Sequence, residues 1–196
     1  MIFENKDGAL LCYRSGETLK IEAWGKDSLR VRATMQTSLS DKVNALTEKA
    51  DVTTGIVVIG EEDFWVGDGS IAKQPVASIT NGRLKAVVNF AGVITFYKDD
   101  KQILREYFRS YGGTLSKESR CLKIVNREWK GIIGGSEYTL NLKFDANPDE
   151  KIFGMGQYQQ ESMELKGCVL ELAQRNSQIS VPFALSSLGY GFLWKV

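Results

Sequence analysis

The sequence predicts an all-β protein with the fold of an antiparallel β-sandwich. Short segments along the chain alternate apolar and polar residues, as strands do when one face is buried and the other is in water. Turn-forming residues, mainly Gly, Asn and Asp, separate these segments. No convincing long helical pattern interrupts the series. Short strands repeated in this way are typical of two packed sheets.

The first strands are predicted at Leu19–Ala23 and Leu29–Met35, with a turn at Gly25–Asp27. Val52–Ile59 is rich in β-branched residues, which favour strands. The polar segment Asp41–Lys49 is consistent with either a short helix or a loop.

The strongest local signal is Asn81-Gly82, which lies between the apolar runs Val76–Thr80 and Arg83–Val88. Asn-Gly favours a tight hairpin because both central turn residues need a positive φ. Further strands are predicted at Val93–Tyr97, Ile103–Phe108, Cys121–Val125, Trp129–Ile133 and Tyr138–Phe144, with a Gly/Ser-rich loop at Ser110–Arg120. No linker or repeat divides the series, so we predict a single domain over residues 1–196.

Composition excludes several classes of protein. The net charge is +1, from 25 basic and 24 acidic residues, which argues against nucleic-acid binding. No apolar run approaches the ~20 residues of a membrane span. The start, Met1–Asp7, lacks the apolar core of a signal peptide, and the three cysteines are widely spaced and odd in number. We therefore expect reduced thiols, no metal site and a cytoplasmic location.

The chain contains no histidine, which excludes a Ser-His-Asp or Cys-His system within it. Any chemistry of the chain alone would rest on carboxylates, lysine or tyrosine. The acid pairs Glu61-Glu62 and Asp99-Asp100 lie in polar, turn-like contexts, and neighbours in a strand point to opposite faces. We assign no catalytic residue and no cofactor.

Glycines, glutamines and aromatic residues gather in the last third of the chain. Gly154-Met155-Gly156 suggests a phosphate loop, but the dinucleotide motif requires a third glycine where Gln159 stands. We interpret the two glycines as a β-bulge or a close backbone approach.

The polar side chains that follow these glycines in the chain include Gln157, Gln159, Gln160, Gln174, Arg175, Asn176 and Ser177. Amides and hydroxyls suit a neutral polyol ligand, whose hydroxyls both donate and accept hydrogen bonds. The alternative is ordinary hydrogen bonding within loops. Composition alone leaves both interpretations open.

The same stretch resembles the N-terminal domain of glycoside hydrolase family 31, the α-glucosidase and α-xylosidase family. The motifs that carry the resemblance are Glu150–Gln157, Lys166-Gly167, Ala173–Ser177 and Val181–Trp194. Weaker similarity extends upstream through Leu29–Thr34.

The resemblance implies a sandwich of the galactose-mutarotase-like type, followed by a (β/α)8 barrel that holds both catalytic aspartates. Those aspartates would lie outside this chain, in a catalytic barrel expected downstream of Val196. The family's N-terminal domain also sends a loop over the active site. Substrate-binding residues implied here are Gln174, Arg175, Asn176 and Ser177, with Gln157 and Tyr158 from a second turn. Some members carry an acid at the position of Asn176.

We therefore expect an accessory domain of a retaining α-glycosidase that hydrolyses α-glucosides or α-xylosides. Its partners would be its own barrel and an α-linked oligosaccharide, and oligomerisation is left open. The main alternative is a free-standing carbohydrate-binding module or lectin-like sandwich. An epimerase of the mutarotase type is a weaker rival, because the chain has no histidine.

Overall fold

The computed structural model describes residues 1–36, 38–39, 54–66, 69–109 and 124–194. Every regular element in these ranges is a strand. The strands are β1 (Ile2–Lys6), β2 (Ala9–Arg14), β3 (Glu17–Ala23), β4 (Leu29–Thr34), β5 (Ile56–Trp65), β6 (Ile71–Asn81), β7 (Leu84–Val88), β8 (Ile94–Lys98), β9 (Lys101–Arg105), β10 (Arg127–Gly131), β11 (Tyr138–Leu142), β12 (Ile152–Gln157), β13 (Ile179–Ser186) and β14 (Tyr190–Leu193).

Some predicted segments lie outside the described residues. They are Asp41–Lys49, Ser110–Arg120 and the greater part of Cys121–Val125. Contacts divide the chain into two compact units, Met1–Asp145 and Ala146–Val196.

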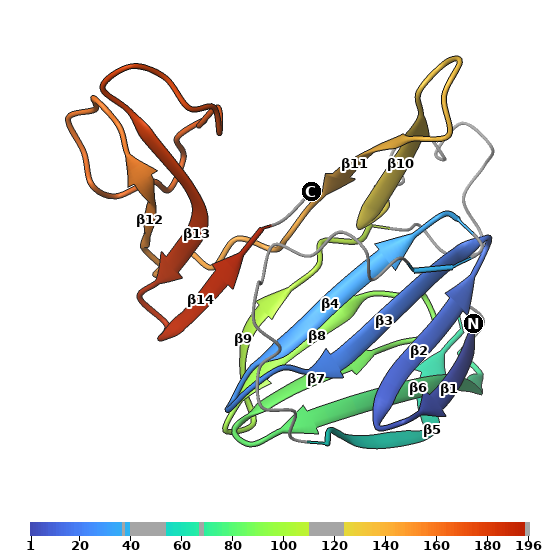
Figure 1. Cartoon of the computed structure of the whole chain (residues 1–196). Coiled ribbons are helices and arrows are strands. Elements are labelled where there is room, and N and C mark those ends of the chain that lie inside the picture. Colours follow the sequence, from blue (N-terminus) through green and yellow to red (C-terminus); the bar gives the residue numbers. More distant parts are fainter. Residues whose placement is uncertain (37, 40–53, 67–68, 110–123, 195–196) are drawn as a thin grey trace. The chain divides into compact units, whose positions relative to one another are not determined.

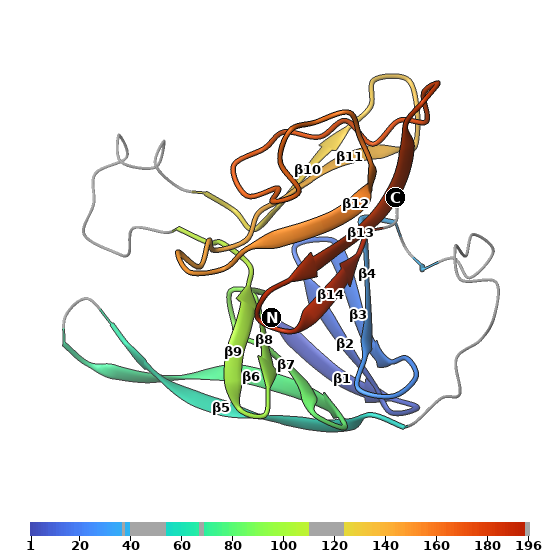
Figure 2. The ribbon, with the colours of Figure 1, turned by 90° about the vertical axis from the view of Figure 1, so that its left-hand side faces the viewer.

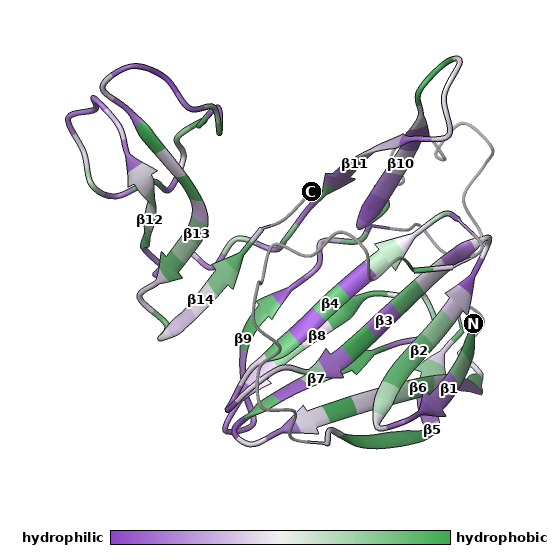
Figure 3. Cartoon of the chain, in the orientation of Figure 1, coloured by the Kyte–Doolittle hydropathy of each residue, from purple (hydrophilic) through white to green (hydrophobic). Residues whose placement is uncertain are grey.

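The N-terminal unit is built on two antiparallel sheets, ordered β1-β2-β3-β4 and β5-β6-β7-β8-β9 (Figure 1). Apolar residues recur along these strands, as the hydropathy colouring shows (Figure 3). Both sheets contribute to one buried core, which contains Leu10, Cys12, Leu19, Ile21, Ala77, Ile79, Ala86, Val88 and Ile94. Two sheets that share a core in this way form a β-sandwich, which confirms the predicted fold class.

Strands β5 and β6 pair over ten residues, from Ile56↔Thr80 to Trp65↔Ile71, and form a long ribbon (Figure 2). Val57 and Ile79, in the part that joins the core, pair with each other. Trp65, at the far end, is 70% exposed. The ribbon therefore adds to the core only through its sheet-bound half.

The predicted hairpin at Asn81-Gly82 exists, but its turn is displaced by one residue. Asn81 pairs with Leu84, so the two central residues are Gly82 and Arg83, and only Gly82 among them has a positive φ. This is the pattern of a type II′ turn. The Asn81 amide is buried and donates hydrogen bonds of 2.7 Å to the carbonyls of Gly25 and Ser28.

A buried charge cluster joins the β10–β11 hairpin to the sandwich. Arg127 donates to Glu17 (Nε to Oε1, 2.8 Å) and to both carboxylate oxygens of Glu106 (2.5 Å each). Asn126 also donates to Glu106, and the Trp129 indole donates to Glu17 at 2.9 Å. Buried charges are tolerated when they are paired and fully hydrogen-bonded in this way.

Candidate functional site

The C-terminal unit contains the predicted site and is based on one antiparallel sheet, β12-β13-β14. Its base is the buried carboxylate of Glu150, which accepts hydrogen bonds from Ser186 and from the Tyr190 hydroxyl, the latter at 2.6 Å. Partial burial, and then the hydrogen bond to Glu150, raise the pKa of Tyr190. Glu150 thus ties the start of β12 to the β13–β14 hairpin.

The predicted bulge lies between β12 and β13. Gly154 pairs with Ala184 and Gly156 pairs with Ser180, so β13 carries two more residues than β12 between these pairs. Pro182 is one of the residues in the expanded stretch, where a missing N–H costs no ladder hydrogen bond. The interpretation of the two glycines as a bulge with close backbone approach is confirmed.

Backbone geometry explains why both positions are glycine. Three successive residues have positive φ: Gly154 at 94°, Met155 at 65° and Gly156 at 114°. A Cβ on Gly154 would lie 2.5 Å from the carbonyl oxygen of Phe183, and one on Gly156 would lie 2.0 Å from that of Ile179. Neither position tolerates a side chain without movement of the backbone.

The predicted loop Gln174–Ser177 ends in a tight turn. The Gln178 N–H donates to the carbonyl of Arg175 at 3.0 Å, and these two residues form an isolated β-bridge. Asn176 and Ser177 are the central residues, and Ser177 has a φ of 67°. Both are exposed, and among the described residues neither side chain forms a hydrogen bond. The turn therefore presents two free polar side chains.

The side chains of the two residues before this tip have partners: Arg175 pairs with a side chain and Gln174 with a backbone segment. Arg175 forms an ion pair with Glu171, four residues earlier. Gln174 forms two hydrogen bonds with the backbone of Ser180: its Nε2 donates to the carbonyl at 2.8 Å, and its Oε1 accepts from the N–H at 3.2 Å.

The second predicted turn reaches the same serine. The Tyr158 hydroxyl donates to Ser180 Oγ at 2.8 Å, while Gln157 ends β12 opposite Ile179. Ser180 thereby connects the two predicted loops, although sequence reasoning did not select it. Its place opposite the strained Gly156 is visible only once the register is known.

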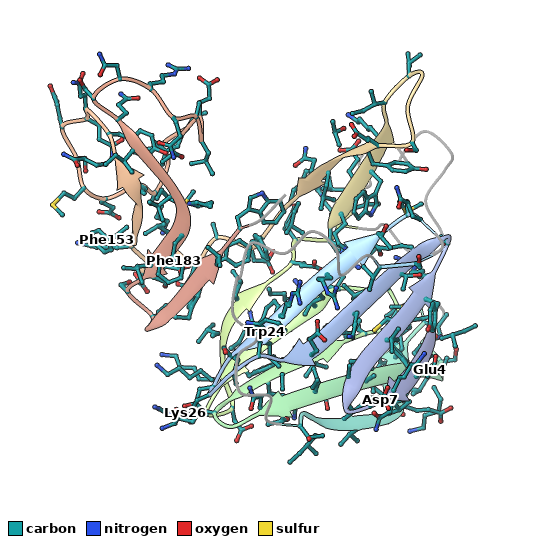
Figure 4. The ribbon with its side chains drawn as sticks, in the orientation of Figure 1. Glu4, Asp7, Trp24, Lys26, Phe153 and Phe183 are labelled. Carbon is teal, nitrogen blue, oxygen red and sulfur yellow. The ribbon has the colours of Figure 1, made fainter. Side chains whose placement is uncertain are left out.

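An apolar stripe runs along one face of the sheet. Phe153 pairs with Leu185, two residues after Phe183, so their side chains share a face; Figure 4 shows Phe153 and Phe183 on adjacent strands. Leu193 pairs with Phe183 and extends this face. Exposed apolar residues on β13 and β14 are Ile179, Val181, Phe183, Leu185 and Leu193. Contiguous exposed apolar side chains of this kind are typical of interaction surfaces.

The free groups at the tip of the turn are an amide and a hydroxyl, which can donate and accept hydrogen bonds. Within the described ranges, no group of three His, Cys, Asp or Glu residues could hold a metal ion. No helix in the same ranges is long and apolar enough to cross a membrane. The exposed amide and hydroxyl at the tip suit a ligand with hydroxyl groups.

Comparison with protein-family models finds no match to this chain. Comparison with individual proteins finds an uncharacterized family 31 glucosidase of Pseudescherichia vulneris, 40% identical over 187 residues, which cover 91% of this chain and 32% of that protein. An α-xylosidase A of Aspergillus niger is 35% identical over 85 residues, or 42% of this chain and 11% of that protein.

Among solved structures, a GH31 α-xylosidase from a soil metagenome, in complex with xylose, superimposes with a TM-score of 0.82. It is 40% identical and covers 99% of this chain, which in turn covers 28% of that protein. The chain spans about a third or less of the length of these relatives. Over nearly its whole length, therefore, the chain is homologous to the glycoside hydrolases of family 31, and it corresponds to their N-terminal β-sandwich domain.

Proposed function

We propose that this chain serves a retaining α-glycosidase that hydrolyses α-xylosides or α-glucosides, by packing on the catalytic barrel and completing the sugar-binding pocket. The α-xylosidases among its relatives support this substrate class. The proposal includes a cytoplasmic location, which the free thiols of Cys12 and Cys168 support.

The observation that carries the proposal is the exposed turn at Asn176 and Ser177. Its side chains are free, yet the backbone on either side is fixed by the Arg175–Gln178 bridge and by Gln174. A preorganised polar tip favours recognition of a sugar hydroxyl, because little conformational entropy is lost on binding. In the proposal, the rim formed by Gln157, Tyr158, Gln174, Arg175, Asn176 and Ser177 faces the substrate.

The apolar stripe supports the other half of the proposal. Leu185 and Leu193 are each 47% exposed, and Val181 is 45% exposed. A carbohydrate-binding module acting alone would favour an exposed aromatic platform beside polar groups, whereas contiguous apolar residues with no polar groups among them are typical of a surface that binds another protein domain. We assign the stripe to contact with the barrel.

A chimaera tests the proposal directly. The corresponding part of the soil-metagenome α-xylosidase would be replaced by residues 1–196 of this chain, and hydrolysis of an aryl α-xyloside measured. We expect an active chimaera, in which Asn176→Ala lowers kcat/KM about fivefold, the equivalent of one hydrogen bond. A well-folded chimaera without activity, or an Asn176→Ala variant with unchanged kcat/KM, would contradict the proposal.

Experiments on the purified chain distinguish the proposed accessory domain from a free-standing carbohydrate-binding module. On its own it is expected to leave aryl α-glucosides and α-xylosides unhydrolysed, since the proposal places both catalytic carboxylates on the barrel. Calorimetric titration with α-linked oligosaccharides is expected to show no binding at millimolar concentration. Tight binding by the isolated chain would favour the carbohydrate-binding module instead.

A further inference from the structure

We infer that Gln174 and Tyr158 are positioning residues: both act through Ser180 to hold the Arg175–Gln178 turn, and contact with the sugar falls to the turn's own Asn176 and Ser177. This inference rests on the proposed function for the role of the turn. We call the hydrogen bonds from Gln174 and Tyr158 to Ser180 the clamp, and the clamp can be tested without an activity measurement.

The first observation is the pair of hydrogen bonds from Gln174 to the backbone of Ser180. A glutamine side chain carries one carbonyl and one NH₂ group, the same donor and acceptor that a peptide group offers. Here Nε2 reaches the Ser180 carbonyl at 2.8 Å while Oε1 accepts from its N–H at 3.2 Å. The Gln174 side chain therefore makes the two hydrogen bonds to Ser180 that the backbone of a neighbouring strand would otherwise make.

The sheet itself explains why such a substitute is needed. Strand β14 pairs with β13 from Phe183 to Ser186, and the Trp194 N–H extends this pairing to the carbonyl of Pro182. Ser180 lies beyond the end of β14, so its backbone groups on that side form a sheet edge. Without a partner on that side, the N–H and C=O groups of Ser180 would remain unpaired. The side chain of Gln174 supplies both hydrogen bonds at this edge.

The second observation is the contact from the other side. Tyr158 donates to Ser180 Oγ at 2.8 Å, so backbone and side chain of the same serine are bound by residues from two loops. The turn begins at Arg175, directly after one clamping residue, and ends two residues before Ser180. Fixing Ser180 and Gln174 relative to each other therefore fixes both ends of the turn.

The polar groups of Gln174 and of Tyr158 are engaged in these bonds, whereas the side chains of Asn176 and Ser177 form none within the described part of the chain. A group already committed to the backbone gains little from a ligand, because the existing bond must first break. Gln174 and Tyr158 therefore position the turn, whereas Asn176 and Ser177 form its tip and remain available to a ligand.

Amide hydrogen exchange on the purified chain tests the clamp. In Gln174→Met, which keeps the length and removes both hydrogen bonds, we expect the Ser180 amide to exchange roughly tenfold faster. The same change at Gln102, an exposed glutamine in β9, is the matched control and is expected to leave Ser180 unaffected. Unchanged exchange at Ser180 in Gln174→Met would overturn the clamp.

A double-mutant cycle in the α-xylosidase chimaera tests the positioning role. If Tyr158 acts through Ser180, then Tyr158→Phe, Ser180→Ala and the double variant are each expected to lower kcat/KM by about fivefold, with no further loss in the double variant. If Tyr158 instead contacts the sugar, Ser180→Ala is expected to leave kcat/KM unchanged, or the double variant is expected to lose the product of the two single losses in kcat/KM. Either result would overturn the inference. Three silent variants would overturn it as well. An inactive chimaera would refute the proposed function, whereas the exchange experiment would still decide the clamp.

Discussion

Arg127 donates from Nη1 to both carboxylate oxygens of Glu106, each at 2.5 Å, inside the N-terminal unit. Glu106 is 2% exposed, and Glu17 pairs with the other side of the same guanidinium. Burial alone would lower the pKa of Arg127, but the two carboxylates outweigh it and raise the pKa. The guanidinium therefore stays charged at every pH at which the protein folds.

We expect Arg127→Met to destabilise the chain by about 3–5 kcal/mol, since it leaves two carboxylates buried without their cation. Urea unfolding followed by circular dichroism measures the loss. Arg83→Met is the control, because the ion pair of Arg83 with Asp99 is solvent-exposed and is expected to change the midpoint little. Equal losses in the two variants would refute the central role of the buried cluster.

Gly156→Ala is expected to destabilise the C-terminal unit far more than Gly167→Ala does. Both glycines have positive φ, but a Cβ at Gly156 would lie 2.0 Å from the carbonyl oxygen of Ile179, whereas a Cβ at Gly167 meets nothing within 4 Å. The second variant carries only backbone strain of ~1 kcal/mol. Thermal unfolding, together with amide hydrogen exchange in β12 and β13, distinguishes the two variants. Comparable stability of Gly156→Ala and Gly167→Ala would mean that the bulge can relax to accommodate a Cβ.

The partial burial of Tyr190 and its hydrogen bond to Glu150 predict a dependence of stability on alkaline pH. Because the pKa of Tyr190 is raised above its ordinary value of 10.0, the folded state favours the neutral phenol. The resulting stability is complete below pH 10 and is lost as the pH rises toward the folded-state pKa. We expect the stability difference between wild type and Tyr190→Phe to shrink from pH 9 to pH 11. A difference that stays constant over this range would contradict the raised pKa of Tyr190.

Cys12 and Cys168 are expected to differ in the rate at which their thiols react. Burial raises the pKa of Cys12 to about 12, whereas Cys168 is exposed. In a Cys121→Ser background, a disulfide-exchange reagent at pH 8 is expected to modify one thiol in the folded chain and two after unfolding. Adding Cys168→Ser is expected to abolish the folded-state reaction. Fast labelling of Cys12 in folded protein would contradict its burial in the core.

The alternation of apolar and polar residues was sufficient to predict the sandwich. Leu19 and Ile21 are buried while Lys20 and Glu22 point away from the core, as period two requires. The Asn81-Gly82 hairpin was also predicted, but its turn was placed one residue too early. A buried amide that satisfies two carbonyls of a neighbouring turn outweighed the local preference of Asn for a positive φ.

The candidate site was predicted by residue type but not by role. Asn176 and Ser177 were selected for their polar side chains, and the turn leaves these groups free. Ser180 was not selected, and Glu150 was named only as the first residue of a matched motif, without a role. Their importance comes from pairing across strands that are 22 to 40 residues apart in the chain.

The all-β chain, the bulge at two glycines and the resemblance to family 31 could be predicted from the residues alone, since they depend on side-chain periodicity, backbone freedom and local motifs. Which polar groups are free and which hold the fold could not be predicted in this way, because it depends on contacts between distant segments. A hydrogen bond needs its partner within about 3 Å, and the register that brings Gln174, Tyr158 and Ser180 together is set by strand pairing between distant segments.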